Sequence, residues 1–302
     1  MRLLSKRSRF RIWDRPLERP FPLALAACAG VAISLVAAAV VSDWERQKAE
    51  AAFDRLAETH VNAIRHSLGE CIQELREVRG LFTASNLVER DEFCAFCARL
   101  PDNTRGLEVV GWAPRVPGEQ RTEFERRTRA EGLADFEIRA PDESGHWNRA
   151  PERAEYFPLH YVVPADAGGD LLGHDLAADP AWAGLLDRAR DTGQTVSTRA
   201  FHWEGLPDQP WVLMTFEPVY ANGVLSDTVA RRRENLEGFI AGVLHVATIV
   251  ESGLAGVARA GVRTRIYDVS GPGVPVLVYG PPLPPESSPL PAPRLLSTGT
   301  IC

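Results

Sequence analysis

Cysteine and histidine are scarce in this sequence of 302 residues, which contains five of the first and seven of the second. With 45% hydrophobic and 25% charged residues the composition is that of a globular chain, so collagen-like, low-complexity and disulfide-dense classes are excluded. The histidines do not fall at zinc-ligand spacing, and Cys94 and Cys97 form a lone CxxC pair with no preceding strand. We therefore expect no metal site and no cofactor, and interpret the two cysteines as residues on a helix face.

Motifs of the common catalytic classes are also missing. The sequence contains no HExxH, GxSxG or SxxK. GPG at 271–273 lacks the rest of a dinucleotide fingerprint, and ADAGGD at 165–170 has too few carboxylates for a calcium loop. No catalytic residue is therefore predicted, and the chain is not expected to be an enzyme by itself.

The charge is unevenly distributed along the chain. Residues 1–22 carry seven basic and two acidic side chains, a net +5, so the remainder carries −11 of the total of −6. Only 2 of the 34 basic residues are lysines, which we interpret as a bias of genome base composition rather than phosphate recognition. An acidic body lacks the positive surface that nucleic-acid binding needs, so no nucleic-acid partner is expected.

Only one long apolar run is present. Residues 23–41 contain no charge, and as a helix they would span roughly 28 Å, the thickness of a bilayer's hydrocarbon core. Basic residues precede the run and acidic ones follow it, so the positive-inside bias predicts a cytoplasmic tail over 1–22 and an extracytoplasmic location for residues 43–302. A buried core helix and a cleaved signal peptide are the alternatives to this prediction. We expect an uncleaved, single-pass anchor in the inner (plasma) membrane.

The apolar run is followed by a helical pattern. Between residues 43 and 85, apolar or small side chains recur every three or four positions, which predicts one stripe along a long helix in a stalk over 42–100. Two compatible interpretations stay open: a stalk that forms a homodimer with the same helix of a second copy, or a domain helix that packs on its own sheet. The stripe comprises Phe53, Leu56, His60, Ala63, Ser67, Cys71, Leu75, Val78 and Phe82.

Short strands dominate the region from 101 to 280. Helices are expected only over 119–131, 179–191 and 248–257, the second with Pro180 in its first turn and Gly193 past its end. This pattern predicts an α+β fold, with an antiparallel sheet, helices to its side and a long helix before it. Residues 281–302 include PPLPPESSPLPAP and are expected to form a poorly ordered proline-rich tail. Strands are expected over residues 107–116, 136–139, 195–203, 211–220, 239–246, 262–268 and 274–279.

Six short motifs in this region carry a family resemblance. They are GWAPRV (111–116), YFPLHYVVP (156–164), LGHDLAADP (172–180), ARDTG (189–193), TFEPVY (215–220) and GFIAGVLHV (238–246). With them the chain resembles the CHASE domain family, the extracytoplasmic sensory domain of bacterial and plant receptors linked to histidine kinases and nucleotide cyclases. The resemblance implies two PAS-like modules after the long helix, of which the membrane-distal one holds a small ligand, an adenine-type hormone in the plant members.

The resemblance also implies a ligand-binding site. Its polar anchor is an aspartate that corresponds to Asp175, a main-chain contact falls near Ser197, and the walls correspond to Phe216 and Leu244. Thr198 is an alternative to Ser197, because adjacent residues of a strand face opposite sides. A carboxylate in an apolar pocket can accept two N–H bonds from a purine-like or amine-bearing ligand. The alternatives are that Asp175 caps the following helix and that Phe216 and Leu244 are core residues.

These observations predict a membrane-anchored extracytoplasmic sensor that binds a small molecule and takes part in signal transduction without an output domain of its own. Family members usually continue into a second membrane span and a cytoplasmic output domain, and this sequence shows neither before Cys302. The alternatives are a truncated sensor half of a histidine kinase or diguanylate cyclase, and a stand-alone membrane-anchored binding protein.

Overall fold

The computed structural model of the chain describes residues 20–85, 87–100, 106–164, 171–203, 208–257, 262–271 and 273–282. The first helix, α1 (Pro20–Ala84), contains the apolar run, and a short helix, α2 (Arg90–Cys97), follows it. Within the described residues one helix, Ala24–Ala84, is apolar and long enough to cross a membrane, and its most apolar window is entirely exposed. The basic residues 1–19, the ADAGGD segment at 165–170 and the proline-rich residues 283–302 lie outside the described residues.

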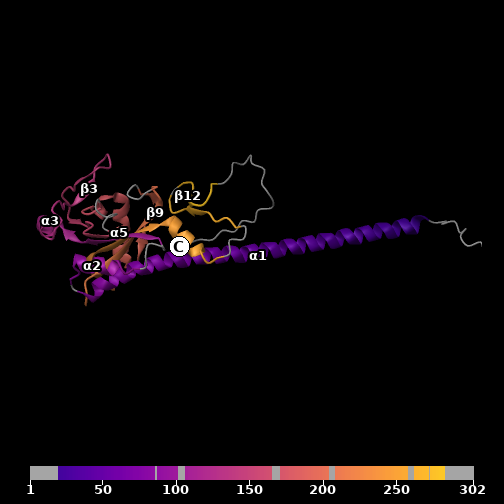
Figure 1. Cartoon of the computed structure of the whole chain (residues 1–302), viewed down its shortest axis with the longest axis horizontal. Helices are drawn as coiled ribbons and strands as arrows, with labels where there is room; N and C mark the ends of the chain where they lie inside the picture. The colour runs from indigo at the N-terminus through magenta and orange to yellow at the C-terminus, as the bar shows by residue number, and fades with distance from the viewer. Residues whose placement is uncertain are drawn as a thin grey trace, which may run out of the picture. The chain divides into compact units, whose positions relative to one another are not determined.

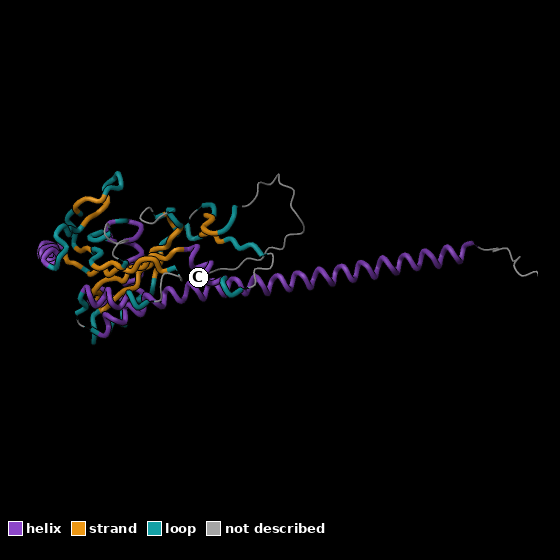
Figure 2. The backbone as a smooth tube through the Cα atoms, in the orientation of Figure 1, coloured by secondary structure: helices purple, strands orange, loops and turns teal. Residues whose placement is uncertain are grey.

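A single antiparallel sheet forms the centre of the fold, in the order β6-β1-β10-β9-β7, with β8 paired to β9 (Figure 2). The two longest strands, β9 (Trp211–Tyr220) and β10 (Leu236–His245), pair with each other. The long N-terminal helix and this sheet confirm the α+β prediction. The remaining strands of the sheet are β1 (Leu107–Pro114), β6 (Tyr161–Val163), β7 (Val196–Ser197) and β8 (Phe201–His202).

Alternate residues of the central strands belong to two different apolar layers. Helices lie on both sides of the sheet, as Figure 1 shows. We call the apolar layer on one side the α5-face cluster, because α5 (Pro180–Thr192) covers it. The layer on the other side, the α1-face cluster, packs against α1 and α2. The α5-face cluster includes Val212, Met214, Phe216, Phe239, Ala241, Val243, Leu176, Leu186 and Ala189, and the α1-face cluster includes Cys71, Leu75, Val78, Phe82, Phe93, Val219, Ile240 and Leu244.

The stripe on α1 packs against the chain's own sheet. Cys71, Leu75 and Val78 are fully buried there. Gly242 of β10 allows this close approach, because a Cβ atom at that position would lie 2.6 Å from Cδ2 of Leu75. The domain-helix interpretation of the stripe is therefore observed, and pairing with a second copy stays a prediction.

The edge of the sheet carries a smaller subdomain. Helix α3 (Arg121–Ala130) follows the short elements β2 (Val116–Pro117) and η2 (Gly118–Gln120). Arg121 and Glu125 of α3 form a buried ion pair of 2.9 Å, and the Arg121 guanidinium also donates to the carbonyls of Ile138 and Ala150. These bonds tie α3 to a hairpin of β3 (Arg139–Pro141) and β4 (Trp147–Arg149), and β5 (Glu155–Tyr156) pairs with β2.

The C-terminal elements form a second, smaller unit of core. Helix α7 (Val246–Leu254) follows β10 directly, and β11 (Ile266–Asp268) pairs with β12 (Val276–Tyr279). Their apolar side chains pack with Ile64 of α1. At Gly253 of α7 an added Cβ would lie 2.9 Å from the carbonyl oxygen of Ala63, so the two helices are in close contact.

Candidate functional site

Asp175 is the most buried carboxylate beside the α5-face cluster, with 1% of its surface exposed. Its Oδ1 atom accepts hydrogen bonds from the backbone N–H groups of Phe157, at 2.8 Å, and Ala177, at 3.1 Å. It thereby caps the short helix η3 (Leu176–Ala178), which precedes α5. Among the described residues Oδ2 has no hydrogen-bond partner, and the Arg153 guanidinium lies 3.7 Å from it. One carboxylate oxygen therefore caps η3, and the other accepts no hydrogen bond from the described residues.

The electrostatics around Asp175 are set by burial. Burial raises the pKa of the Asp175 carboxyl above its ordinary value, and the backbone donors of Phe157 and Ala177 and the charge of Arg153 oppose this rise. The neighbouring His174 stacks on Trp147 with ring centroids 3.5 Å apart and an interplanar angle of 5°. A ligand N–H bonded to Oδ2 would stabilise the ionised carboxylate and relieve part of its desolvation cost.

Phe216 lies on the same side of the sheet as Asp175. It is fully buried in the α5-face cluster, and its ring centroid is 6.1 Å from that of Trp182 on α5. Leu176 and Phe157, which flank or bond to Asp175, have side chains in the same cluster. The fold therefore brings Asp175 and Phe216, which are 41 positions apart in the sequence, to one apolar layer.

The structure places the other predicted residues differently. Leu244 is fully buried in the α1-face cluster, on the opposite side of the sheet from Phe216. The Ser197 hydroxyl lies 2.9 Å from that of Thr215. Thr215 shares its side of β9 with Glu217, two positions further, which contacts α1. The Ser197–Thr215 pair therefore also faces α1. The Thr198 hydroxyl is turned back to the backbone, where it accepts from the N–H of Met214 at 3.0 Å. Asp175 and Phe216 thus form one group, and Leu244 and Ser197 lie on the α1 side.

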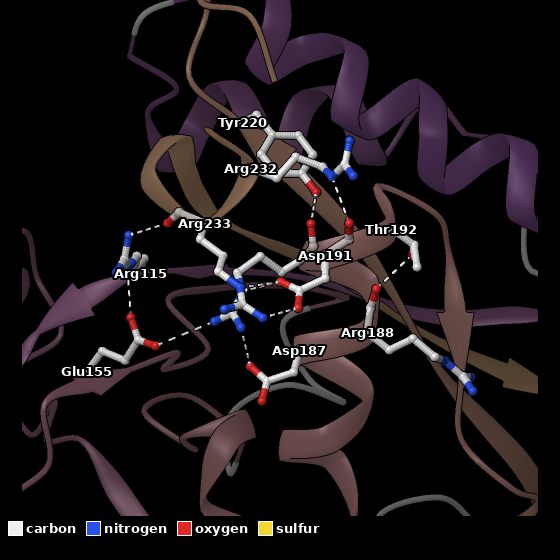
Figure 3. Close-up of polar contacts among 10 residues, drawn as sticks. Arg115, Glu155, Asp187, Arg188, Asp191, Thr192, Tyr220, Arg232 and Arg233 are labelled. Carbon is white, nitrogen blue, oxygen red and sulfur yellow. Dashed lines mark hydrogen bonds and ion pairs between the residues drawn. The ribbon is translucent and has the colours of Figure 1, made fainter. Parts of the chain in front are cut away.

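The ARDTG and TFEPVY motifs meet at the C-terminal end of α5 (Figure 3). The Asp191 carboxylate accepts two hydrogen bonds from the Arg233 guanidinium, at 2.9 and 2.5 Å, and one from Arg190 at 3.0 Å. These arginines hold the pKa of Asp191 well below its usual range. The Tyr220 hydroxyl donates to the carbonyl of Arg190 at 2.5 Å, and burial raises its pKa to about 12. Both motifs thus fix the end of α5 against β9, so in this structure their role is to position the helix.

Glu217 is a buried polar residue that the sequence pattern did not single out. It is 1% exposed and forms ion pairs with Arg79 and, at 3.9 Å, Arg76, both on α1. The Thr195 hydroxyl also donates to it. Glu217 follows Phe216 directly on β9, so adjacent residues of one strand contact the two opposite clusters. The TFEPVY motif contains this glutamate, but its ion-pair partners Arg79 and Arg76 lie 138 and 141 positions away in the sequence and leave no local signal.

A known family covers most of the chain beyond α1. The CHASE domain family matches residues 86–279. The chain belongs to the CHASE domain family. It therefore carries a CHASE sensory domain, and this confirms the resemblance that the six motifs indicated.

Two curated relatives of this CHASE chain are histidine kinases. "Hybrid signal transduction histidine kinase A" from Dictyostelium discoideum is 23% identical over 83% of this chain and 12% of its own length. "Probable histidine kinase 6" from Oryza sativa subsp. japonica is 25% identical over 86% of this chain and 27% of its own length. This chain therefore spans about an eighth and about a quarter of these relatives.

One solved structure is distantly similar to this CHASE chain. It is the ligand-binding domain of the Pseudomonas aeruginosa PAO1 amino acid chemoreceptor PctC in complex with GABA, with 13% identity and a TM-score of 0.40. The match covers 72% of this chain and 70% of that domain. Within the described residues no group of three or more His, Cys, Asp or Glu side chains could hold a metal ion.

Proposed function

We propose that this CHASE chain is a membrane-anchored extracytoplasmic sensor that binds a small molecule on the α5 side of its sheet. The observation that carries the proposal is the carboxylate of Asp175, which is 1% exposed and has one oxygen without a hydrogen-bond partner in the described part of the chain, beside an apolar layer. Buried polar atoms are nearly always bonded, so an unbonded one is a candidate contact for a ligand.

The ligand class follows from the acceptor. An ionised or hydrogen-bonding carboxylate selects a partner with N–H donors, and the apolar layer around Phe216 favours a flat or aliphatic body. We propose an amine-bearing or purine-like small molecule, which agrees with the ligand that the plant members bind. Phe216 would contribute to the wall, whereas Leu244, Ser197 and Thr198 would act only if the sheet and its edge rearranged on binding.

The architecture supports two modules after the anchor. The six-stranded sheet with α5 would form a membrane-distal PAS-like module, and α7 with the β11–β12 hairpin a smaller membrane-proximal one. Residues 23–41 would cross the membrane, residues 42–100 would connect it to the domain over 101–280, and the basic tail would be cytoplasmic. The exposed apolar side chains of α1, such as Leu25, Ile33 and Leu35, support an anchor, because exposing so continuous an apolar surface to water is energetically unfavourable.

The signal of ligand binding would pass from the α5 side of the sheet to α1 through the two faces of β9. A ligand on the α5 side that favours one arrangement of Phe216 would also shift Glu217, its neighbour, which is paired with α1 on the other side. The response depends only on the difference in ligand affinity between the two arrangements of α1. A homodimer through α1 would let two copies change together across the membrane.

A second candidate is the sensor half of a histidine kinase. Both curated relatives are named histidine kinases and are much longer than this chain. Sequencing the gene beyond codon 302 tests it: a kinase domain in frame or after a frameshift supports this candidate, and its absence favours a separate binding protein.

Replacing Asp175 with asparagine tests the ligand site. Asparagine keeps one oxygen to accept from Phe157 and Ala177 but replaces the Oδ2 acceptor with a donor, so affinity for an N–H-bearing ligand should fall about tenfold to a hundredfold. The measurement is calorimetric titration of the full chain in nanodiscs with adenine, N6-substituted adenines and polyamines. The control is Asp179→Asn, because Asp179 only caps α5. Equal binding by wild type and Asp175→Asn would disprove the site.

A further inference from the structure

A cavity lies in the smaller C-terminal unit, and none of the five predicted site residues lines it. Its volume is about 170 Å³. It is formed by α1, the end of α7, the segment before β11 and the end of β12. The side chains that matter for its chemistry are His60, Leu254, Val262, Arg263, Thr264 and Tyr279.

Among the described residues that line this cavity, Arg263 is positively charged and none is acidic. Within the described residues Arg263 makes no hydrogen bond or ion pair, although most arginines of this domain are paired with a carboxylate or a carbonyl. Arg265, two positions further, donates to the carbonyl of Pro281 at 2.6 Å and does not line the cavity. An arginine without a partner beside a cavity is well placed to bind an anion, because a guanidinium offers several donors in a plane.

His60 adds a buried polar group to the same wall. It is 4% exposed on the inner face of α1, and its Nδ1 atom lies 3.2 Å from the hydroxyl of Thr264. Burying an imidazole and a hydroxyl costs free energy unless both are bonded, and here each is placed beside the other. Together with Arg263 they give the cavity lining three different polar groups.

The size of the cavity limits the ligand. At about 170 Å³ the cavity is smaller than the roughly 300–1,000 Å³ of typical small-molecule sites, so it suits a ligand of only a few heavy atoms. Leu254, Val262 and the ring of Tyr279 supply the apolar part of the lining. A carboxylate with a tail of two or three carbons matches both the volume and a lining that combines a cationic group with apolar side chains.

We infer that this cavity is a binding site for short-chain carboxylates, in which Arg263 and the His60–Thr264 pair hold the carboxylate and the apolar side chains hold the tail. This cavity is separate from the site proposed at Asp175, and ligand binding in the cavity does not depend on Asp175. Because His60 belongs to α1, the ligand would contact the long helix directly instead of acting through the sheet.

The test uses propionate as probe and propionamide, its neutral analogue of equal size, as control. Both are titrated by calorimetry into the full chain in nanodiscs, in a buffer free of carboxylates. Propionate is expected to bind and propionamide to bind at least about tenfold more weakly, because the guanidinium pairs with charge. Arg263→Gln should weaken propionate binding about tenfold to a hundredfold.

Two further variants distinguish binding in this cavity from binding elsewhere on the chain. Arg126→Gln is the control and should bind propionate as the wild type does, since that arginine pairs with Glu123 on α3 and does not line the cavity. Asp175→Asn should also leave propionate binding unchanged, so failure of the other proposed site would not be confused with failure of this one. The inference is overturned if propionate does not bind, if propionamide binds equally well, or if Arg263→Gln has no effect.

Discussion

Replacing Arg76 and Arg79 together with methionine is expected to lower the free energy of unfolding by about 3–5 kcal/mol. These arginines are the ion-pair partners of Glu217, which is 1% exposed between the sheet and α1. Without them, Thr195 is the donor that remains for the buried carboxylate among the described contacts. Burying an unpaired carboxylate in an apolar layer lowers the free energy of unfolding far more than burying the intact ion pair does. Thermal and urea unfolding of the full chain in detergent, followed by tryptophan fluorescence, measures the loss.

The opposite deletion provides the control. Glu217→Gln removes the carboxylate but leaves two arginines whose side chains are 47% and 37% exposed and can turn toward water. That change should cost only about 1 kcal/mol, and adding Glu217→Met to the double arginine variant should restore most of the lost stability. A double arginine variant that is no less stable than Glu217→Gln would contradict a role for this buried pair in holding α1 against the sheet.

Acidification from pH 7 to pH 5 is expected to destabilise the domain by about 4 kcal/mol. Burial, followed by the charges of Arg90 and Arg127, lowers the pKa of His160 to about 3, and burial followed by Arg139 lowers the pKa of His174 to about 3. In the unfolded chain both imidazoles take up protons near pH 6.5, whereas the folded chain resists protonation until about pH 3. Stability is therefore fully present above about pH 6.5 and falls as pH decreases toward about 3.

The sign and the origin of this effect can be checked with substitutions. His160→Phe places a ring among those of Phe124, Phe136 and Tyr161, and should remove about half of the pH dependence. His146→Gln is the control, because the His146 side chain is 81% exposed and should leave the dependence unchanged. The raised pKa of Asp175 acts in the opposite direction, since the folded state then binds its proton more readily. Urea unfolding at pH 7, 6 and 5 measures the dependence, and equal stability at all three would contradict burial of neutral histidines.

Elements with local signals were predictable from the sequence. The prediction for residues 211–220 matches β9, and Pro180 and Gly193 mark the first helical residue and the left-handed residue that ends α5. Helix α6 (Val229–Asn235) was not predicted, because its sequence VARRREN has no apolar face and none of its side chains is buried. The hairpin of β3 and β4, of which only Arg139 falls in a predicted strand, depends on bonds from Arg121 on another element.

Contacts between distant segments could not be predicted. The helical pattern over residues 43–85 matches the end of α1 at Ala84, but it did not indicate that Asn222 donates to the carbonyls of Phe82, at 2.8 Å, and Ser85, at 3.1 Å. Strand alternation identified two faces without showing which one would meet α1. The family resemblance implied that Phe216 and Leu244 line one pocket, whereas in the structure they lie on opposite sides of the sheet.

The most direct test of the sensor account is the membrane topology of the intact chain. Alkaline phosphatase, which is active only outside the cytoplasm, and β-galactosidase, which is active only inside it, are each fused after Pro282 in a bacterial host. The account predicts high alkaline phosphatase activity and little β-galactosidase activity, because the domain that holds Asp175 would face away from the cytoplasm. Strong β-galactosidase activity with inactive alkaline phosphatase would place that domain in the cytoplasm and contradict the account.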